Sequence, residues 1–217
     1  MTTHLTAPHI DYQGLAPLFA LTGGSLIVLM VSLLRPVQIH RVVLPALTVV
    51  ALGATIGLSI WNWEPGDTKP IVEGALAIDT LSLGISVLCS IAGIATVFLS
   101  IRSRAVREAG GGEYYTLLLG SIAGMTVLAG AENLVTLFVG IELLSIPLYV
   151  LCASELHRRV SIEAGLKYLV IGSVGSGTLL YGLAFVYGAT GSTDFNAIGA
   201  AIGDRVPATD PLLLTGI

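Results

Sequence analysis

The feature that most constrains this chain is a series of apolar blocks, each about as long as a bilayer is thick. A helix needs about 20 residues to cross the hydrocarbon core. Six blocks qualify, at roughly 15–34, 42–61, 79–101, 115–131, 133–153 and 162–188. Only 11% of the 217 residues are charged, against roughly a quarter in soluble domains. We therefore predict one all-α domain over residues 1–217, a polytopic transmembrane helical bundle with six spans.

Three boundaries need separate arguments. The stretch 115–153 is too long for one helix, and the segment 129–133 interrupts it, which predicts two helices joined by a tight turn. Residues 194–203 carry Phe195, Ile198 and Ile202 on one helical face and predict an amphipathic segment at the outer surface. Residues 211–217 read as the start of a seventh span, so we expect the chain to be truncated or a fragment of a longer protein.

Basic residues predict the orientation, because short loops rich in Lys and Arg stay in the cytoplasm. The predicted loops place seven on one side and two on the other: Arg35, Arg41, Arg102, Arg104, Arg107, Arg158 and Arg159 against Lys69 and Arg205. The second side also carries four acidic residues, Glu64, Asp67, Glu73 and Asp79. We expect a multi-pass protein of the cell membrane with its N-terminus on the outer face.

Composition excludes several functions. The net charge is -4 and no basic face is present, so nucleic acid is not an expected partner. Cys89 and Cys152 both lie inside apolar blocks and lack the His or Cys neighbours of a metal or redox site. We predict that both are small core residues and that the chain binds no metal.

Two ionisable residues lie clearly within the predicted spans, Glu142 and Lys167. Glu142 follows Asn133 by nine residues, about 14 Å along a helix, which places it near the middle of the bilayer. A carboxyl group at that depth must be paired, protonated or open to water. Ser145 and Tyr149 share its helical face, together with Val135 and Phe138, and this face is expected to point into the protein. Pro147 leaves the carbonyl of Leu143 without its helical hydrogen bond.

The role of each charged residue has alternatives. Lys167 lies only about 8 Å beyond Ile162, so it either reaches back to the headgroups or pairs with Glu142. Glu142 is either a proton-carrying group or an inert acid held by hydrogen bonds. His157 and Glu163, on the cytoplasmic side near Lys167, either feed protons inward or belong to a solvated turn.

Small residues recur at helix-contact spacing. Gly53 with Gly57 and Gly120 with Gly124 form GxxxG pairs, and the sixth block is rich in Gly and Ser. This spacing predicts that helix backbones approach closely there.

Three segments carry a resemblance to a known family: 113–115, 134–150 and 163–168, with the run Glu-Leu-Leu-Ser-Ile-Pro-Leu-Tyr at 142–149 as the most specific part. They resemble subunit N of the proton-pumping NADH-quinone oxidoreductase, respiratory complex I. The resemblance implies that Glu142 matches the family's mid-membrane glutamate and that Lys167 matches a lysine of the next helix. It also implies a membrane-arm subunit without NADH, flavin, iron or other cofactor of its own.

The expected function is therefore a subunit of an H⁺-translocating NADH:quinone oxidoreductase. It performs no redox step itself, and it works in the bilayer beside the other membrane-arm subunits, with quinone bound elsewhere. Family members run to about fourteen helices, and the chain ends where their broken seventh helix, with its central lysine, would begin. Two alternatives stay open: a subunit of a multi-subunit cation/proton antiporter, and a structural membrane subunit without an ion pathway.

Overall fold

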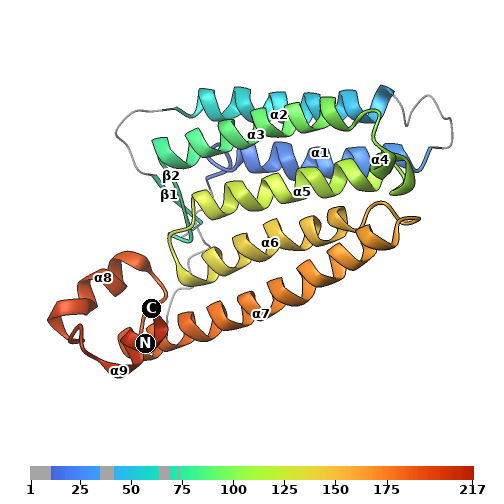
Figure 1. The fold of residues 1–217 in the computed structure, drawn as a ribbon. Helices are drawn as coiled ribbons and strands as arrows, with labels where there is room; N and C mark the ends of the chain where they lie inside the picture. The colour runs from blue at the N-terminus through green and yellow to red at the C-terminus, as the bar shows by residue number, and fades with distance from the viewer. Residues whose placement is uncertain (1–10, 35–41, 64–68, 73) are drawn as a thin grey trace, which may run out of the picture.

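The structure is a computed structural model that describes residues 11–34, 42–63, 69–72 and 74–217. It is a bundle of long helices that lie side by side (Figure 1). In the described residues these are α1 (Ala16–Ser32), α2 (Leu44–Trp61), α3 (Thr80–Ser100), α4 (Arg104–Glu108), α5 (Gly112–Ala129), α6 (Leu134–Cys152), α7 (Arg159–Thr190), α8 (Phe195–Asp204) and α9 (Pro211–Gly216). The predicted all-α membrane bundle is confirmed as the fold class.

One element has no counterpart in the sequence prediction. Strands β1 (Lys69–Ile71) and β2 (Leu76–Ile78) form a small antiparallel hairpin between α2 and α3. The hairpin is tied to the turn between α5 and α6, because the N–H of Ala77 donates to the carbonyl of Gly130 at 2.8 Å and that of Glu132 to the carbonyl of Ala75 at 3.2 Å. These backbone pairings join segments far apart in the chain, which explains why periodicity did not reveal them.

Side chains that bind free backbone N–H groups define where several helices begin. Asp79 accepts from the N–H of Ser82 at 2.7 Å, and the Ser82 hydroxyl receives the N–H of Asp79 in return, which makes a capping box at the start of α3. Asn133 accepts from the N–H of Thr136 at 2.7 Å and starts α6. Helix α5 ends at Ala129 and α6 begins at Leu134, so most of the 129–133 segment forms the turn between the two helices.

The buried core lies on one side of the bundle. Helices α1, α2, α3 and α5 pack together, α6 packs on α5, and α7 packs on α6 (Figure 1). The largest cluster of buried side chains comes from those first four helices and from α4: Leu21, Val28, Leu44, Ala51, Leu52, Val97, Val106, Tyr115, Leu118, Leu119, Ile122 and Ala123. Helices α6 and α7 therefore form the edge of the described bundle.

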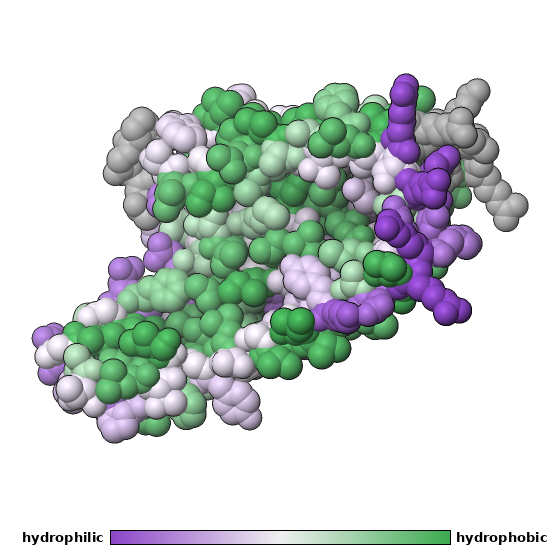
Figure 2. All heavy atoms as spheres, in the orientation of Figure 1, coloured by the Kyte–Doolittle hydropathy of each residue, from purple (hydrophilic) through white to green (hydrophobic). Residues whose placement is uncertain are grey.

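The two ends of the bundle differ in charge. Arg102, Arg104 and Arg107 lie in or beside α4, next to the loop that ends at Arg158 and leads into Arg159, the first residue of α7. We call this the arginine end; hydrophilic atoms gather there in Figure 2, while the flank between the ends is mostly hydrophobic. The opposite, hairpin end carries Lys69. Other residues used for the orientation, Arg35, Arg41, Glu64, Asp67 and Glu73, lie outside the described residues.

The apolar surface fits a bilayer. Four described helices, α2, α3, α6 and α7, are long and apolar enough to cross a membrane, while the apolar α1 is slightly shorter at 17 residues. Large apolar side chains such as Leu99 and Ile171 are 85% and 72% exposed in the isolated chain. A face of this kind is stable against lipid tails. The count of six spans stays a prediction.

The segments after α7 pack against the protein. Ile198 of α8 is buried against Leu134 and Val186, with Phe195 and Ile202 beside them, so the predicted apolar face is covered by α6 and α7. Helix α9, the predicted start of a seventh span, lies along α7. A side chain on Gly182 would meet the carbonyl of Gly216 at 2.8 Å, so the two backbones touch there.

The glycine prediction holds at one GxxxG pair and is wrong at the other. A side chain on Gly124 would fall 2.7 Å or less from the backbone of Leu143 and Leu144, so α5 and α6 approach closely. Gly53 and Gly57 have nothing within 4 Å of the same position. Their face of α2 carries no neighbouring helix in the described structure, so spacing alone did not identify a contact.

Candidate functional site

Glu142 lies in the middle of α6, eight residues after its first residue, which is about 12 Å along the axis. The residue as a whole is half-buried, but its Oε1 is buried and has no hydrogen-bond partner in the described protein. A buried carboxyl oxygen without a partner is costly in apolar surroundings. The inert alternative, an acid held by hydrogen bonds to protein groups, is therefore not supported at Oε1.

The face of α6 that carries Glu142 points partly into the protein. Tyr149 is 7% exposed, and Phe138 and Ser145 are half-buried. Val135 is 59% exposed, so the predicted inward stripe is wrong at this residue. Among the described helices, α6 packs extensively only against α5 and α7, so side chains on its remaining surface stay exposed.

Tyr149 fixes the contact between α6 and α7. Its ring meets that of Tyr168 edge to face, with ring centroids 4.8 Å apart and planes at 88°. Its hydroxyl lies over the backbone of Gly172, where an added side chain would fall about 2.1 Å from the oxygen. Glu142 is seven residues from Tyr149 and thus near the same helical angle, so it belongs to the side of α6 that faces α7.

Lys167 does not contact Glu142 in this structure. Its Nζ lies 2.6 Å from Oε1 of Glu163, one turn earlier on α7, and the two side chains are 69% and 63% exposed. The i,i+4 spacing makes this pair local to one face of α7. Of the two alternatives for Lys167, the pair with Glu142 is not seen in this structure, where the lysine pairs with Glu163 instead.

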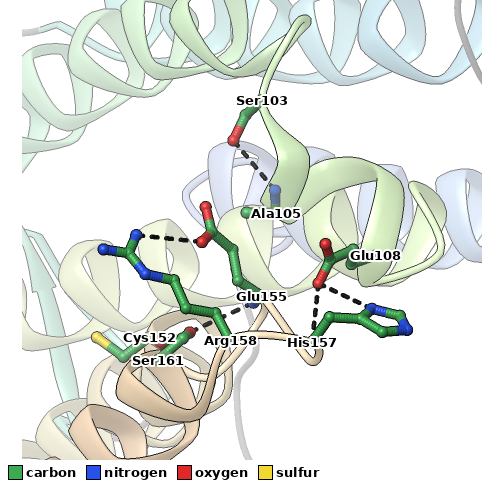
Figure 3. Close-up of polar contacts among 8 residues, drawn as sticks. All are labelled: Ser103, Ala105, Glu108, Cys152, Glu155, His157, Arg158 and Ser161. Carbon is green, nitrogen blue, oxygen red and sulfur yellow. Dashed lines mark hydrogen bonds and ion pairs between the residues drawn. The ribbon is translucent and has the colours of Figure 1, made fainter.

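His157 is held by a residue that the sequence did not indicate. Its backbone N–H donates to Oε2 of Glu108 at 3.1 Å, and its Nδ1 lies 3.3 Å from the same oxygen (Figure 3). Glu108 ends α4, 49 residues earlier in the chain. The loop after α6 is thereby attached to the loop after α3, not to the Lys167 side of α7.

Ser161 and Arg158 close the same loop. The Ser161 hydroxyl donates to the carbonyl of Cys152 at 2.8 Å and accepts from the N–H of Glu155 at 3.3 Å. Arg158 pairs with Glu155 at 3.4 Å (Figure 3). These contacts position the start of α7, and through it Lys167 and Glu163, relative to the end of α6.

The contact with His157 shifts the titration of Glu108. The backbone N–H of His157 lowers the pKa of the Glu108 carboxyl, and its imidazole and Arg104 lower it further, against a smaller opposing effect of burial. Because docking of the loop lowers the pKa of Glu108, the ionised carboxylate stabilises docking at pH values above the ordinary glutamate pKa of about 4.3. This stabilisation is lost as the pH falls through the lowered pKa.

Neutralising Glu108 is expected to loosen this loop at neutral pH. In Glu108→Gln the amide oxygen can still accept from the His157 N–H, but the bond loses its charge assistance and is weaker, so trypsin should cleave after Arg158 and Arg159 roughly threefold faster. Gel analysis of the cleavage time course measures this. Glu132→Gln, at the opposite end, is the control. Equal cleavage rates in wild type and Glu108→Gln would show that the contact does not hold the loop.

Known proteins of one family are similar to this chain. Residues 131–214, from the turn before α6 to α9, match the sequence model described as "NADH:quinone oxidoreductase/Mrp antiporter, TM". NADH-quinone oxidoreductase subunit N 2 of Roseiflexus castenholzii is 34% identical over 94% of this chain. Subunit N of Chloroflexus aggregans is 33% identical over 93%. The chain is therefore similar to members of the NADH:quinone oxidoreductase/Mrp antiporter family.

Two solved membrane complexes contain chains with the same fold. A chain of respiratory complex I from Thermus thermophilus aligns over 92% of this chain with a TM-score of 0.72 and 28% sequence identity. A chain of the archaeal membrane-bound sulfane sulfur reductase aligns over 94% with a TM-score of 0.73; at 22% identity it shows the fold alone. The chain spans about 40% of the length of the relatives that it matches. The part that the family model matches contains Glu142, Tyr149 and Lys167.

Proposed function

We propose that this antiporter-like subunit carries protons as part of a membrane-bound NADH-quinone oxidoreductase, with Glu142 as the group that takes up and releases the proton. The observation that carries the proposal is the buried Oε1 of Glu142, which lies mid-helix and has no hydrogen-bond partner in the described protein. An acid in that position exchanges a proton when a cation or water approaches or leaves. The similarity to subunit N supports the redox partner.

Lys167 is the proposed cationic partner. In this structure its ammonium group pairs with the carboxylate of Glu163, which lies closer to the arginine end of α7. Both side chains are exposed in the isolated chain, so the described protein leaves Lys167 room to move away from Glu163. We propose that the lysine alternates between Glu163 and the Glu142 side of α7. When it lies near Glu142 it stabilises the carboxylate; when it returns to Glu163, Glu142 binds a proton.

The residues around this pair have positioning roles in the proposal. Ser145 lies on α6 between Glu142 and Tyr149, and the Tyr149–Tyr168 contact sets the spacing of α6 and α7. His157 and Glu163 lie at the arginine end, where the path would meet water on the proposed cytoplasmic side. Each proton moved against 100 mV costs about 2.3 kcal/mol, which redox chemistry in partner subunits must supply. The chain itself is proposed to hold no cofactor.

Co-purification tests the proposed assembly. The chain, tagged at one end and expressed in its native membrane, is expected to bring down other membrane-arm subunits and NADH-quinone reductase activity. The family description also covers Mrp antiporters. Recovery of a cation/proton antiporter complex without NADH-quinone reductase activity would favour that second function and contradict the proposed one.

A further inference from the structure

A row of buried hydroxyl groups lies in the part of the bundle away from Glu142. Several Ser and Thr side chains on α2, α3 and α5 are 7% exposed or less: Thr48, Thr55, Ser59, Ser82, Ser86, Ser90, Ser100 and Ser121. Four of them bind a carbonyl of their own helix at 2.8–2.9 Å: Thr48, Thr55, Ser100 and Ser121. Such hydroxyls are satisfied locally and need no further partner.

Three of the hydroxyls behave differently. Ser59 of α2 reaches across to Ser86 of α3, with 3.5 Å between the two oxygens. Ser90, one turn further along α3, is fully buried, and its Oγ has no hydrogen-bond partner in the described protein. A hydroxyl buried in an apolar site without a partner is energetically costly. The Ser90 hydroxyl therefore calls for a small polar ligand.

A cavity at the hairpin end reaches Ser86, one helical turn before Ser90. It has a volume of about 50 Å³ and lies between the start of α1, the hairpin, α3 and the end of α5. Ser82, Ser86 and Thr126 contribute hydroxyls to a lining that is otherwise mostly apolar. One water needs roughly 10–15 Å³ of such space and two to four polar partners. The cavity has room for a few waters, and its serine hydroxyls offer them hydrogen-bond partners.

The spacing of the serines suits a file of waters. Ser82, Ser86 and Ser90 follow one another at four-residue intervals on the buried face of α3. Neighbours at this spacing have Cβ atoms about 5–6 Å apart, a separation that one water bridges with two hydrogen bonds. Ser90 lies ten residues into α3, about 15 Å along the axis and thus close to mid-membrane.

Beyond Ser90 the same face is closed by apolar groups. A side chain on Gly93 would fall 2.5 Å from Ile122 and 3.2 Å from Leu52, and Val97 is fully buried. The close packing of Gly93 against Ile122 and Leu52 leaves no room for water directly past Ser90. We propose that the seam between α2, α3 and α5 binds a short file of waters that enters at the hairpin end and stops at the Ser90 hydroxyl.

Silver-ion accessibility of introduced thiols tests the file in the full chain. The background is Cys89→Ala with Cys152→Ala, since these are the two cysteines of the sequence. Ser90→Cys is added, permeabilised membranes are exposed to Ag⁺, and the remaining thiol is labelled with a polyethylene-glycol maleimide after denaturation. Ag⁺ is small enough to follow water and reacts with thiolate, which forms only in a hydrated site.

Two matched variants serve as controls. Val97→Cys lies on the same buried face beyond the apolar closure, and Ile91→Cys is 56% exposed on the lipid side. Ser90→Cys is expected to be blocked at least about tenfold faster than both. Adding Ser86→Val, which fills the path, should return the blocking rate of Ser90→Cys to that of Val97→Cys.

The variant Ser86→Cys, closer to the cavity, provides a second test if Ser90→Cys misfolds. Its thiol should also react at least about tenfold faster than that of Val97→Cys. The proposal would be overturned if Ag⁺ blocked the thiol introduced at Ser90 or Ser86 no faster than the thiol of Val97→Cys or Ile91→Cys.

Discussion

Replacing Glu142 by Gln is expected to cut proton pumping by the assembled complex by at least about half, because an amide cannot take up and release a proton at this depth. Gln keeps the size of the side chain and a polar group at the position of the buried Oε1. Packing between α6 and α7 through Tyr149 should therefore persist. The measurement is acidification of membrane vesicles driven by NADH, normalised to the amount of assembled complex.

A surface carboxylate gives the matched control. Glu113, at the start of α5, is exposed, so Glu113→Gln should pump like wild type. Undiminished pumping in Glu142→Gln, with normal assembly, would show that Glu142 carries no proton. In that case the alternative of a structural subunit without an ion pathway would be favoured.

Adding a single methyl group at Gly124 is expected to produce the largest loss of stability. In Gly124→Ala the new carbon would lie 2.3 Å from the backbone N of Leu144 and 2.6 Å from the carbonyl carbon of Leu143. Backbone cannot move aside as a flexible side chain can, so α5 and α6 must separate. Overpacking of this kind costs roughly 1–3 kcal/mol or more. It should also displace Glu142, which lies one residue before this contact.

A proline lies at the same helix crossing. Pro147 has no N–H, so the carbonyl of Leu143 lacks its usual helical partner at the place where α5 crosses. Pro147 itself is buried, and its ring lies 3.7 Å from the position of a side chain on Gly120. The crossing thus combines a glycine on one helix with a proline-altered turn on the other, within one turn of Glu142.

The thermal unfolding midpoint in detergent measures the effect. Gly53→Ala is the matched control, because nothing lies within 4 Å of its added carbon. It should unfold at or slightly above the wild-type temperature, since Ala favours a helix over Gly. A Gly124→Ala protein as stable as Gly53→Ala would mean that α5 and α6 are not in contact at this residue.

The sequence by itself determined the fold class and the approximate position of each long helix. In a bilayer every backbone N–H and carbonyl must be bonded within its own segment, so a spanning block of apolar residues has one available structure. The same reasoning located Glu142 near the middle of α6, because depth depends only on residue count along a helix. These properties are local, so a single amino-acid sequence is sufficient to predict them.

The tertiary structure decided which groups meet. Lys167 bonds Glu163 instead of Glu142, His157 bonds Glu108, and Gly124 rather than Gly53 lies at a helix crossing. A helix that is apolar on all sides carries no pattern that marks its packed face, because lipid and protein are equally apolar. Which groups meet depends on the shape of the side chains at each helix crossing and on loops that join distant segments. The spacing of residues along the sequence predicts neither.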